Sequence, residues 1–280
     1  MAGTLYLCAT PIGNLKDMTP RVVETLNGVD LIAAEDTRNS RKLLNYFQIH
    51  TPMTSYHEYN KVEKARELIA QLEAGKEIAL ITDAGTPAIS DPGEVLVRMC
   101  HEAGLKVTSL PGPAACITAL TLSGLGTRRF CFEGFLPFED KKEYRAVLEE
   151  LKEETRTIIL YEAPHHLVRT LNALYETLGE RKITLCRELT KKFETVFPTT
   201  LQGAIAYYET QEPRGEYVLV LEGKSREEKK REKEAAFAEL SIEEHMLLYT
   251  KQGMDKKEAM RCVAKDRGIS RREVYQALQA

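Results

Sequence analysis

The sequence predicts an α/β fold with two successive α/β domains and a small helical appendage. Through the first 223 residues, short apolar runs alternate with stretches of helical periodicity. Such alternation is typical of a mostly parallel sheet that helices cover on both faces. From 224 to 234 the composition becomes almost entirely charged. These observations predict domains at residues 1–123 and 124–223, and an appendage at 224–280.

The first predicted domain begins with a β-rich run at residues 4–9. In the helix that follows, Thr19 can cap the N-terminus and Pro20 takes the first helical position. Asn60 is expected to cap a stronger helix, with Glu63 in capping-box register. The other expected elements are strands at 30–34, 78–82 and 107–110, and helices that start at Asp91-Pro92 and at Ala114.

The second predicted domain repeats the alternation after a glycine-rich boundary at residues 123–126 (SGLG). Strands are expected at 129–135, 157–162, 183–188 and 217–222, and helices at 141–152, 166–178 and 201–209. This region therefore carries enough elements for a sheet of its own.

The appendage contains three short helical patterns after its charged start. Ser241, Asp255 and Ser270 can cap them, and Gly253 and Gly268 separate them, which predicts a helix-turn-helix type of unit. Residues 224–280 hold 14 Lys/Arg and 11 Asp/Glu, a local charge of +3, whereas the rest of the chain carries −6. Charge alone leaves two interpretations open, a solvated helical tail and a nucleic-acid contact.

Bulk composition restricts the class of protein. Hydrophobic residues make up 43% of the chain and charged residues 29%, as in globular proteins. No apolar run approaches the roughly 18 residues of a membrane helix, and the first residues lack the pattern of a signal peptide, so we expect a cytoplasmic protein without a membrane partner. The six cysteines are scattered, and no His/Cys cluster has zinc spacing, so no metal is expected.

Three loops follow predicted strands and are rich in Gly, Pro or small residues: 10–17, 82–93 and 111–115. Ligands of open α/β sheets bind beyond the carboxyl ends of the strands. The sequence has no Gly-x-Gly-x-x-Gly after a strand and no Gly-Lys-Ser/Thr phosphate loop, which disfavours dinucleotides and nucleoside triphosphates. Tight turns without a phosphate cradle suit a ligand without phosphate, and S-adenosylmethionine is such a ligand.

Eight motifs, spread in order over nearly the whole chain, carry a family resemblance. They are residues 9–17 (ATPIGNLKD), 34–38 (AEDTR), 55–60 (SYHEYN), 109–113 (SLPGP), 134–137 (GFLP), 161–165 (YEAPH), 187–191 (RELTK) and 215–217 (GEY). Together they resemble the tetrapyrrole (corrin and porphyrin) methylase superfamily. Within it they are most similar to the branch that methylates the ribose 2′-oxygen of a cytidine in small-subunit (16S) ribosomal RNA.

The resemblance implies two α/β domains with S-adenosylmethionine in the cleft between them, a homodimer, and ribosomal RNA or the small ribosomal subunit as substrate. By position, it implies cofactor contacts at Ile12, Asp83, Ala84, Gly85, Thr86, Pro87, Ile89, Pro113, Ala114, Ala115, Tyr161, Leu189 and Tyr217.

The chain departs from the wider superfamily, whose corrin methylases carry Gly-Asp-Pro in the second loop. Here that stretch is residues 85–87 (GTP), which favours the RNA branch. Within the branch, His166 replaces a commoner arginine, and Phe138 replaces a commoner basic residue. Anion contacts are therefore not carried over to either position.

A positioned general base increases the rate of a reaction at a ribose hydroxyl by roughly 10²–10⁴-fold. The candidate catalytic residues are Asp17, Glu35, Asp36, His57 and Glu58. His57 has the natural pKa for the task, but a surface histidine ahead of a helix is an equal alternative. The Glu35-Asp36 pair can instead orient Arg38 or cap the next helix.

Five basic residues are the expected RNA contacts. Arg38 and Lys42 are expected to hold a phosphate, and Arg271 and Arg272 lie in the basic appendage. Lys191 either lines the RNA entrance or belongs to a surface charge network.

Two other functions remain open at the level of sequence. A C-methylase of a tetrapyrrole precursor needs no basic appendage, and a non-enzymatic RNA-binding protein needs no cofactor loops.

Overall fold

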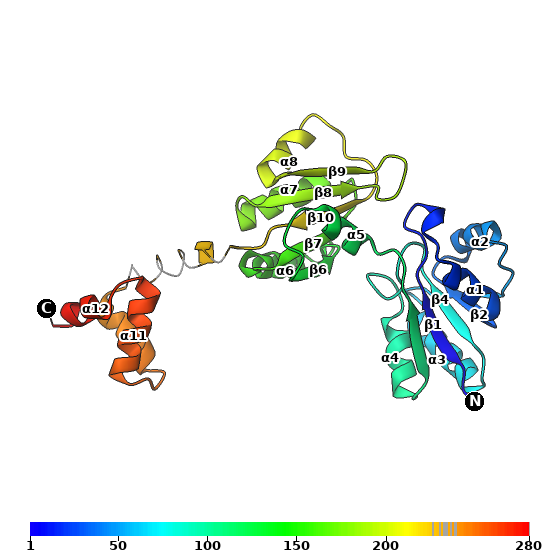
Figure 1. Cartoon of the computed structure of the whole chain (residues 1–280), viewed down its shortest axis with the longest axis horizontal. Coiled ribbons are helices and arrows are strands. Elements are labelled where there is room, and N and C mark those ends of the chain that lie inside the picture. The colour runs from blue at the N-terminus through cyan, green and yellow to red at the C-terminus, as the bar shows by residue number, and fades with distance from the viewer. Residues whose placement is uncertain (226, 230, 232–234, 236, 238–239, 280) are drawn as a thin grey trace. The chain divides into compact units, whose positions relative to one another are not determined.

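The computed structural model describes residues 1–225, 227–229, 231, 235, 237 and 240–279. It divides into two compact units, each described by itself. Unit 1 comprises residues 1–151 and 156–222, and unit 2 comprises residues 152–155 and 223–280 (Figure 1). The predicted charged stretch at 224–234 lies partly outside the described residues.

The first sheet of unit 1 is entirely parallel. Its strands have the order β3-β2-β4-β1-β5. They are β1 (Thr4–Cys8), β2 (Leu31–Ala34), β3 (Met53–Ser55), β4 (Ile78–Ile81) and β5 (Lys106–Leu110). All five therefore point their carboxyl ends to one edge of the sheet, where the three glycine- and proline-rich loops follow β1, β4 and β5.

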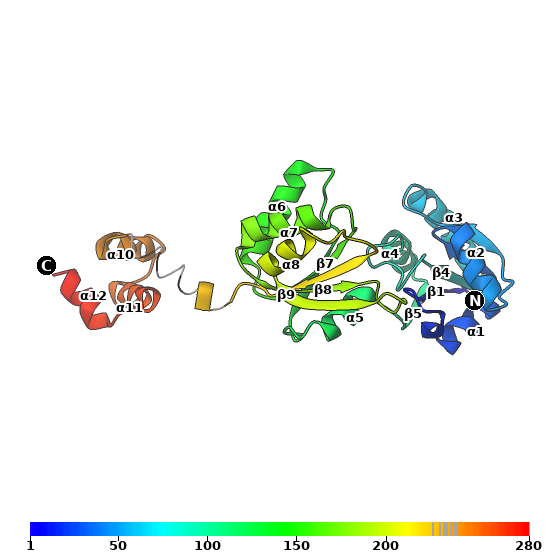
Figure 2. The same cartoon turned by 90° about the horizontal axis from the view of Figure 1, so that it is seen from above.

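Helices cover both faces of this sheet, as the alternation predicted (Figures 1 and 2). Ala79 and Ile81 of β4 pack in one apolar core with α1 (Pro20–Gly28) and α2 (Thr37–Tyr46). Ile78 and Leu80 pack in the other core with α3 (Lys61–Glu73) and α4 (Glu94–Glu102). Successive strand residues face opposite sides, so a fully buried strand such as β4 is apolar throughout.

The second sheet is mixed, which the sequence did not predict. Its order is β6-β7-β10-β8-β9, and only β6 and β7 pair in parallel. The strands are β6 (Phe130–Gly134), β7 (Thr157–Glu162), β8 (Lys182–Arg187), β9 (Thr195–Thr200) and β10 (Tyr217–Leu221). Because β10 runs antiparallel to both neighbours, its amino end lies at the same edge as the carboxyl ends of β7 and β8.

Both faces of the second sheet are covered. Alternate residues such as Ile158 and Leu160 of β7 pack with α6 (Lys141–Glu153), α7 (Leu167–Leu178) and α8 (Leu201–Tyr208). Ile159 packs on the other face with α5 (Ala115–Leu122). The helix that ends the first predicted domain thus packs on the second sheet. The division at residue 123 stays a prediction.

Local differences from the expected elements have identifiable causes. Asn60 precedes α3 but makes no capping bond, because its side-chain oxygen accepts the backbone N–H of His57 at 2.8 Å. The helix expected at Asp91-Pro92 starts at Glu94 instead, since Ser90 (φ 61°) and Gly93 (φ 160°) have non-helical backbones. The short strands β3 and β9 were not predicted, and helix α2 was anticipated only as the helix that Glu35-Asp36 could cap.

Unit 2 contains the three predicted helices, α10 (Ile242–Thr250), α11 (Lys256–Arg267) and α12 (Arg271–Ala277). Ser241 and Ser270 form capping boxes, and Asp255 accepts the backbone N–H of Glu258. These bonds satisfy N–H groups that a helix start leaves unpaired. Met246, Ala259, Val263, Ala264 and Val274 form the small core of this unit. In the described ranges, no helix is both long and apolar enough to cross a membrane.

Candidate functional site

Unit 1 contains a cavity of about 470 Å³ at the edge where the loops of both sheets meet. Cavities that hold small-molecule ligands span roughly 300–1,000 Å³ and are mostly apolar with a few placed polar groups. This cavity fits that description. Small and apolar side chains line it from the first sheet's loops, and aromatic and charged side chains join from the second sheet.

One side of the cavity, the first-sheet wall, consists of the loops after β1, β4 and β5, and hydrogen bonds between these loops fix their positions. The backbones of Thr10 and Gly85 exchange two bonds, of 2.8 and 3.0 Å, and the Thr10 hydroxyl donates to the Thr82 carbonyl. The Thr86 hydroxyl donates to the Pro113 carbonyl at 3.0 Å. The loops after β1, β4 and β5 are therefore tied together and present a fixed surface.

Gly85 occupies a position that only glycine adopts without strain. Its φ is +85°, and a Cβ there would lie 3.2 Å from the Cγ2 of Ile12, another cavity residue. The left-handed conformation and the close approach together explain the glycine. They keep the backbone of this loop next to the space that a ligand would fill.

The second-sheet wall comes from three strand ends. Tyr161 and Glu162 end β7, Cys186 lies near the end of β8 with Glu188, Leu189 and Lys191 just after it, and Tyr217 begins β10. Tyr217 pairs with Glu162 on one side and with Arg187 on the other. The antiparallel pairing of β10 thus places a strand start beside two strand ends.

Tyr161 connects this wall to α5. Its hydroxyl accepts the backbone N–H of Cys116 in the first turn of α5 at 3.2 Å. Its ring contacts those of Phe132 and Phe135, with centroids 4.8 and 5.6 Å away. Burial raises the pKa of the Tyr161 hydroxyl, so this group stays a neutral phenol near pH 7.

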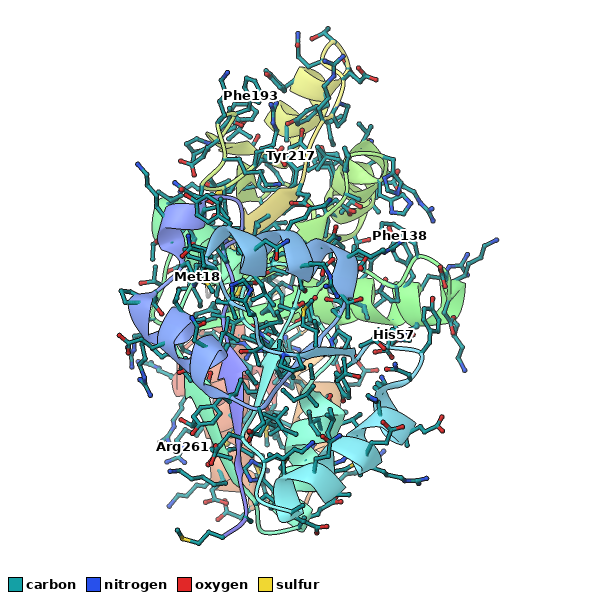
Figure 3. All side chains as sticks on the ribbon, turned by 90° about the vertical axis from the view of Figure 1, so that its right-hand side faces the viewer. Met18, His57, Phe138, Phe193, Tyr217 and Arg261 are labelled. Atoms are coloured by element: carbon teal, nitrogen blue, oxygen red, sulfur yellow. The ribbon has the colours of Figure 1, made fainter. Side chains whose placement is uncertain are left out.

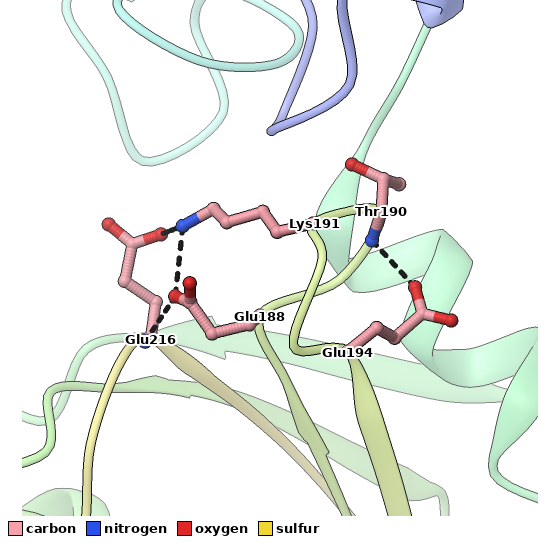
Figure 4. A network of polar contacts seen from close by, with 5 residues as sticks. All are labelled: Glu188, Thr190, Lys191, Glu194 and Glu216. Atoms are coloured by element: carbon pink, nitrogen blue, oxygen red, sulfur yellow. Dashed lines mark hydrogen bonds and ion pairs between the residues drawn. The ribbon is translucent and has the colours of Figure 1, made fainter.

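A charged network borders the cavity (Figure 4). The Lys191 ammonium contacts Glu188 at 2.9 Å and Glu216 at 2.8 Å. Burial alone would lower the pKa of Lys191, but the two carboxylates raise it. Burial alone would raise the pKa of Glu188, but the Glu216 N–H and Lys191 lower it. Of the two open interpretations of Lys191, the structure shows the charge network, at the rim of the cavity.

Most of the residues expected to bind the cofactor line this cavity. Those that do are Ile12, Ala84, Gly85, Thr86, Ile89, Ala114, Ala115, Tyr161, Leu189 and Tyr217. Asp83, Pro87 and Pro113 lie in the same loops without lining it. The Asp83 carboxylate accepts a bond from Asn39 of α2 at 3.1 Å, so it is held to the neighbouring helix.

Several further cavity residues were not among the expected cofactor contacts. They are Ser90, Asp91, Phe135, Glu162, Ala163, Pro164, His165, Cys186, Glu188, Glu216 and Val218. Ser90 and Asp91 lie in the loop at 82–93, and most of the others lie in the motifs at 134–137, 161–165, 187–191 and 215–217, so their segments were recognised. Cys186 and Val218 lie outside these motifs and join the cavity through the pairing of β8 with β10.

The acids after β2 lie outside the cavity lining but differ in their surroundings. Glu35 accepts a hydrogen bond from the hydroxyl of Thr82, the first residue of the loop at 82–93, at 2.6 Å. Asp36 caps α2 by accepting the N–H of Arg38 at 2.8 Å, and it also forms an ion pair with the Arg38 side chain. The alternative role of Asp36, capping the helix and orienting Arg38, is the one the structure shows.

The other three catalytic candidates also lie outside the cavity lining. His57 follows β3, and Figure 3 shows it well apart from Tyr217. Its Nδ1 is buried and has no hydrogen-bond partner within the described part of the chain, and the same holds for Asp17 Oδ2. Glu58 is exposed and pairs with Lys61. None of the three touches the cavity in this structure.

The expected RNA contacts fall on exposed helical surfaces. Arg38 and Lys42 are one helical turn apart on α2, and the Arg38 side chain is 89% exposed. Arg271 and Arg272 are exposed at the start of α12 in unit 2. Each pair can therefore reach an anion without rearrangement of the fold.

The chemistry of the cavity fits S-adenosylmethionine. Its first-sheet wall offers small side chains and backbone groups, and its second-sheet wall offers aromatic faces and carboxylates. An adenine and a ribose suit the former, and a cationic sulfonium suits the latter. No glycine-rich phosphate cradle is present in the sequence.

Comparison with known proteins defines the class. Residues 4–205 match the family of Tetrapyrrole (Corrin/Porphyrin) Methylases. The chain belongs to this family. Methylases of this kind use S-adenosylmethionine, so the expected cofactor is confirmed.

Relatives with high identity match nearly the whole chain. The Ribosomal RNA small subunit methyltransferase I of Synechocystis sp. is 50% identical over 275 residues, which cover 98% of this chain and 96% of that protein. The protein of the same name from Bacillus subtilis is 47% identical and covers 98% and 94%. The expected similarity to methyltransferases of small-subunit ribosomal RNA is thus confirmed, and the matched region extends into unit 2.

Solved structures share the fold at low identity. A diphthine synthase superimposes with a TM-score of 0.61 at 15% identity, covering 80% of this chain and 91% of that chain. The uroporphyrin-III-C-methyltransferase of Thermus thermophilus gives 0.55 at 18% identity, covering 78% and 94%. These likenesses confirm the predicted fold class.

Proposed function

We propose that this protein transfers a methyl group from S-adenosylmethionine to the ribose 2′-hydroxyl of a cytidine in small-subunit (16S) ribosomal RNA. The observation that carries the proposal is the match of 98% of the chain to relatives named as ribosomal RNA small subunit methyltransferases. A ribosomal substrate also makes the cytoplasm the site of action.

The cavity residues have distinct tasks in this proposal. The tied loops at Thr10, Gly85 and Thr86 hold the cofactor in a fixed position. When bound, the cofactor supplies a methyl group on a cationic sulfur. Fixed walls matter because transfer needs the acceptor oxygen roughly 3–3.5 Å from the methyl carbon and in line with the leaving sulfur.

RNA contacts would come from both units. Arg38 and Lys42 present a basic face on α2, next to the helix cap at Asp36. Arg271 and Arg272 add charge in unit 2, and Lys191 stands at the cavity rim. Phosphate contacts position an RNA without reading its sequence. The chosen cytidine must therefore be selected by the shape of the RNA and by the cavity.

Among the candidate bases, Glu35 has the strongest structural link to the cavity, through Thr82. We include Asp17, Asp36, His57 and Glu58 in the proposal as residues that contact the RNA or order the loops. We also propose that the protein forms a homodimer, which a measurement of its molar mass in solution would test.

The experiment adds labelled S-adenosylmethionine and the protein to small subunits and to free rRNA from cells that lack the enzyme. We expect label on the ribose of one cytidine, and a loss of label with Arg38→Ala combined with Lys42→Ala. Label on a base would discard the 2′-oxygen and keep the RNA. Label in neither substrate would remove the RNA proposal, and tetrapyrrole precursors would then be the substrates to assay.

A further inference from the structure

Asp91 is the acidic group of the cavity that the first sheet contributes, and no sequence candidate included it. It lies in the loop between β4 and α4, beside Ile89 and Ser90. Glu35, by contrast, is outside the cavity lining and contacts this loop through the Thr82 hydroxyl and the Asp83 N–H. Asp91 therefore lines the same cavity as the residues expected to bind the cofactor.

The loop that carries Asp91 is strained. Ala88 (φ 66°) and Ser90 (φ 61°) adopt the left-handed conformation, which is unfavourable for residues other than glycine. A Cβ at Gly93 would lie 2.7 Å from the Cβ of Ala88, so the loop also folds closely on itself. Strain of this kind persists only where the surrounding structure holds it, and it clusters at functional sites.

Asp91 interacts with a second carboxylate. The Thr82 hydroxyl donates its single proton to Glu35 at 2.6 Å, and the Asp83 N–H approaches the same Glu35 oxygen at 3.5 Å. The loop that carries Asp91 therefore holds Glu35 at its own start. The negative charge of Glu35 disfavours the ionised form of Asp91, so it favours a proton on Asp91.

We propose that Asp91 is the proton acceptor for the RNA hydroxyl, and that Glu35, held by Thr82, is the neighbouring carboxylate whose charge favours this proton transfer. This inference rests on the proposed function. The hydroxyl oxygen forms a bond to the methyl carbon, and its proton passes to Asp91. The electron pair of the breaking carbon–sulfur bond stays on sulfur, which becomes neutral.

The electrostatics agree with this role. Burial, and after it the charge of Glu35, raises the pKa of Asp91 to about 6. A base with this pKa is ionised at pH 7 yet takes up a proton readily. Other charged or titratable groups facing it or lining the same cavity are Asp83, Tyr161, Glu162, His165, Glu188, Lys191 and Glu216.

The first test needs no substrate. In protein labelled with ¹³C at aspartate carboxyl groups, one resonance that Asp91→Asn removes is expected to titrate near pH 6. In Glu35→Gln that midpoint should fall, because a negative charge that disfavours ionised Asp91 is gone. A midpoint near 4 in the unmodified protein, or no change in Glu35→Gln, contradicts the coupling.

The second test measures single-turnover methyl transfer to small subunits between pH 5 and 8. The rate should rise with pH and level off above about 6, because the ionised form of Asp91 is the active one. Asp91→Asn should lower the rate by about 10²–10⁴-fold and abolish this rise. Cofactor affinity, from calorimetry, should change by less than about twofold, and Glu35→Gln should move the rise to lower pH.

Controls separate the rival explanations. Glu24→Gln, on the exposed face of α1, removes a distant carboxylate and should leave rate and pH profile unchanged. A full rate with Asp91→Asn and a lost pH dependence with His57→Ala would move the role to His57. A parallel loss of cofactor affinity in Asp91→Asn would make Asp91 a cofactor ligand instead. If the unmodified protein labels neither RNA nor subunits, the proposed function fails, whereas the titration still decides the coupling.

Discussion

The two sheets of unit 1 supply the same cavity by different means. The first sheet is all parallel and contributes only loops that follow strand carboxyl ends. The second is mixed, and it contributes the ends of β7 and β8 together with the start of β10. The rule that ligands bind at strand carboxyl ends therefore describes half of this site. Where strands run antiparallel, an amino end such as Tyr217 serves equally well.

The difference extends to the kind of groups supplied. The first sheet offers backbone and small side chains, held by bonds such as those between Thr10 and Gly85. The second sheet offers long side chains. Tyr161 is positioned by its hydrogen bond with Cys116, and Lys191 by its ion pair with Glu216. We expect the first wall to be sensitive to backbone changes and the second to loss of single polar groups.

The largest expected effect tests whether the two sheets unfold together. Leu80→Ala in β4 and Leu219→Ala in β10 each open a cavity in a different, fully packed core. Each should lower the free energy of unfolding by about 2–5 kcal/mol. Because α5 joins the sheets, urea unfolding followed by fluorescence and by circular dichroism should show one shared transition for unit 1. Two separate transitions would show that the sheets are independent.

Gly85→Val tests the backbone of the first wall. A β-branched residue at φ +85° and close to Ile12 should weaken cofactor binding about 10- to 100-fold, from about 1–3 kcal/mol of strain. The measurement is calorimetric titration with S-adenosylmethionine. Gly104→Val is the matched control, because Gly104 also has a positive φ (+66°) but nothing lies near its Cβ position. Equal affinity losses in both variants would contradict a local effect.

Tyr161→Phe tests a single polar group of the second wall. It removes the acceptor of the Cys116 N–H and should reduce stability by about 1 kcal/mol. Tyr217→Phe is the comparison, since its hydroxyl accepts the Arg214 N–H within the second-sheet region. Thermal unfolding with and without cofactor should show that only Tyr161→Phe disturbs the packing of α5. Identical behaviour of the two variants would remove the distinction.

The smallest effect concerns pH. A hydrogen bond from the Arg38 side chain lowers the pKa of Asp36 to about 2 in the folded protein, below its usual value near 3.9. The stabilisation by ionised Asp36 is therefore present above about pH 3.9 and fades as the pH falls towards 2. Arg38→Ala should return the pKa of Asp36 towards its ordinary range, as NMR titration of its carboxyl group can measure. No movement would show that the helix N-terminus, and not Arg38, controls this pKa.

Local chemistry explains which parts of the fold were predictable. The caps at Thr19, Ser241 and Ser270 are short-range side-chain hydrogen bonds, and they were predictable because Ser and Thr are preferred at helix N-caps. The buried strand β4 is a continuous apolar run. Asn60 shows the limit of such reasoning, because its side chain serves a turn at His57 and not the helix it precedes.

By itself, the sequence determined the parallel first sheet, the three glycine- and proline-rich loops and the helical appendage, and its family motifs predicted most of the first-sheet residues that line the cavity. These follow from periodicity, from turn chemistry and from motifs that lie within one segment. Only the tertiary structure decided that Asp91 lies in the cavity, that β10 brings Tyr217 beside Glu162, and that Lys191 pairs with Glu188 and Glu216. The physical reason is that strand direction and charge pairing depend on contacts between segments far apart in the chain.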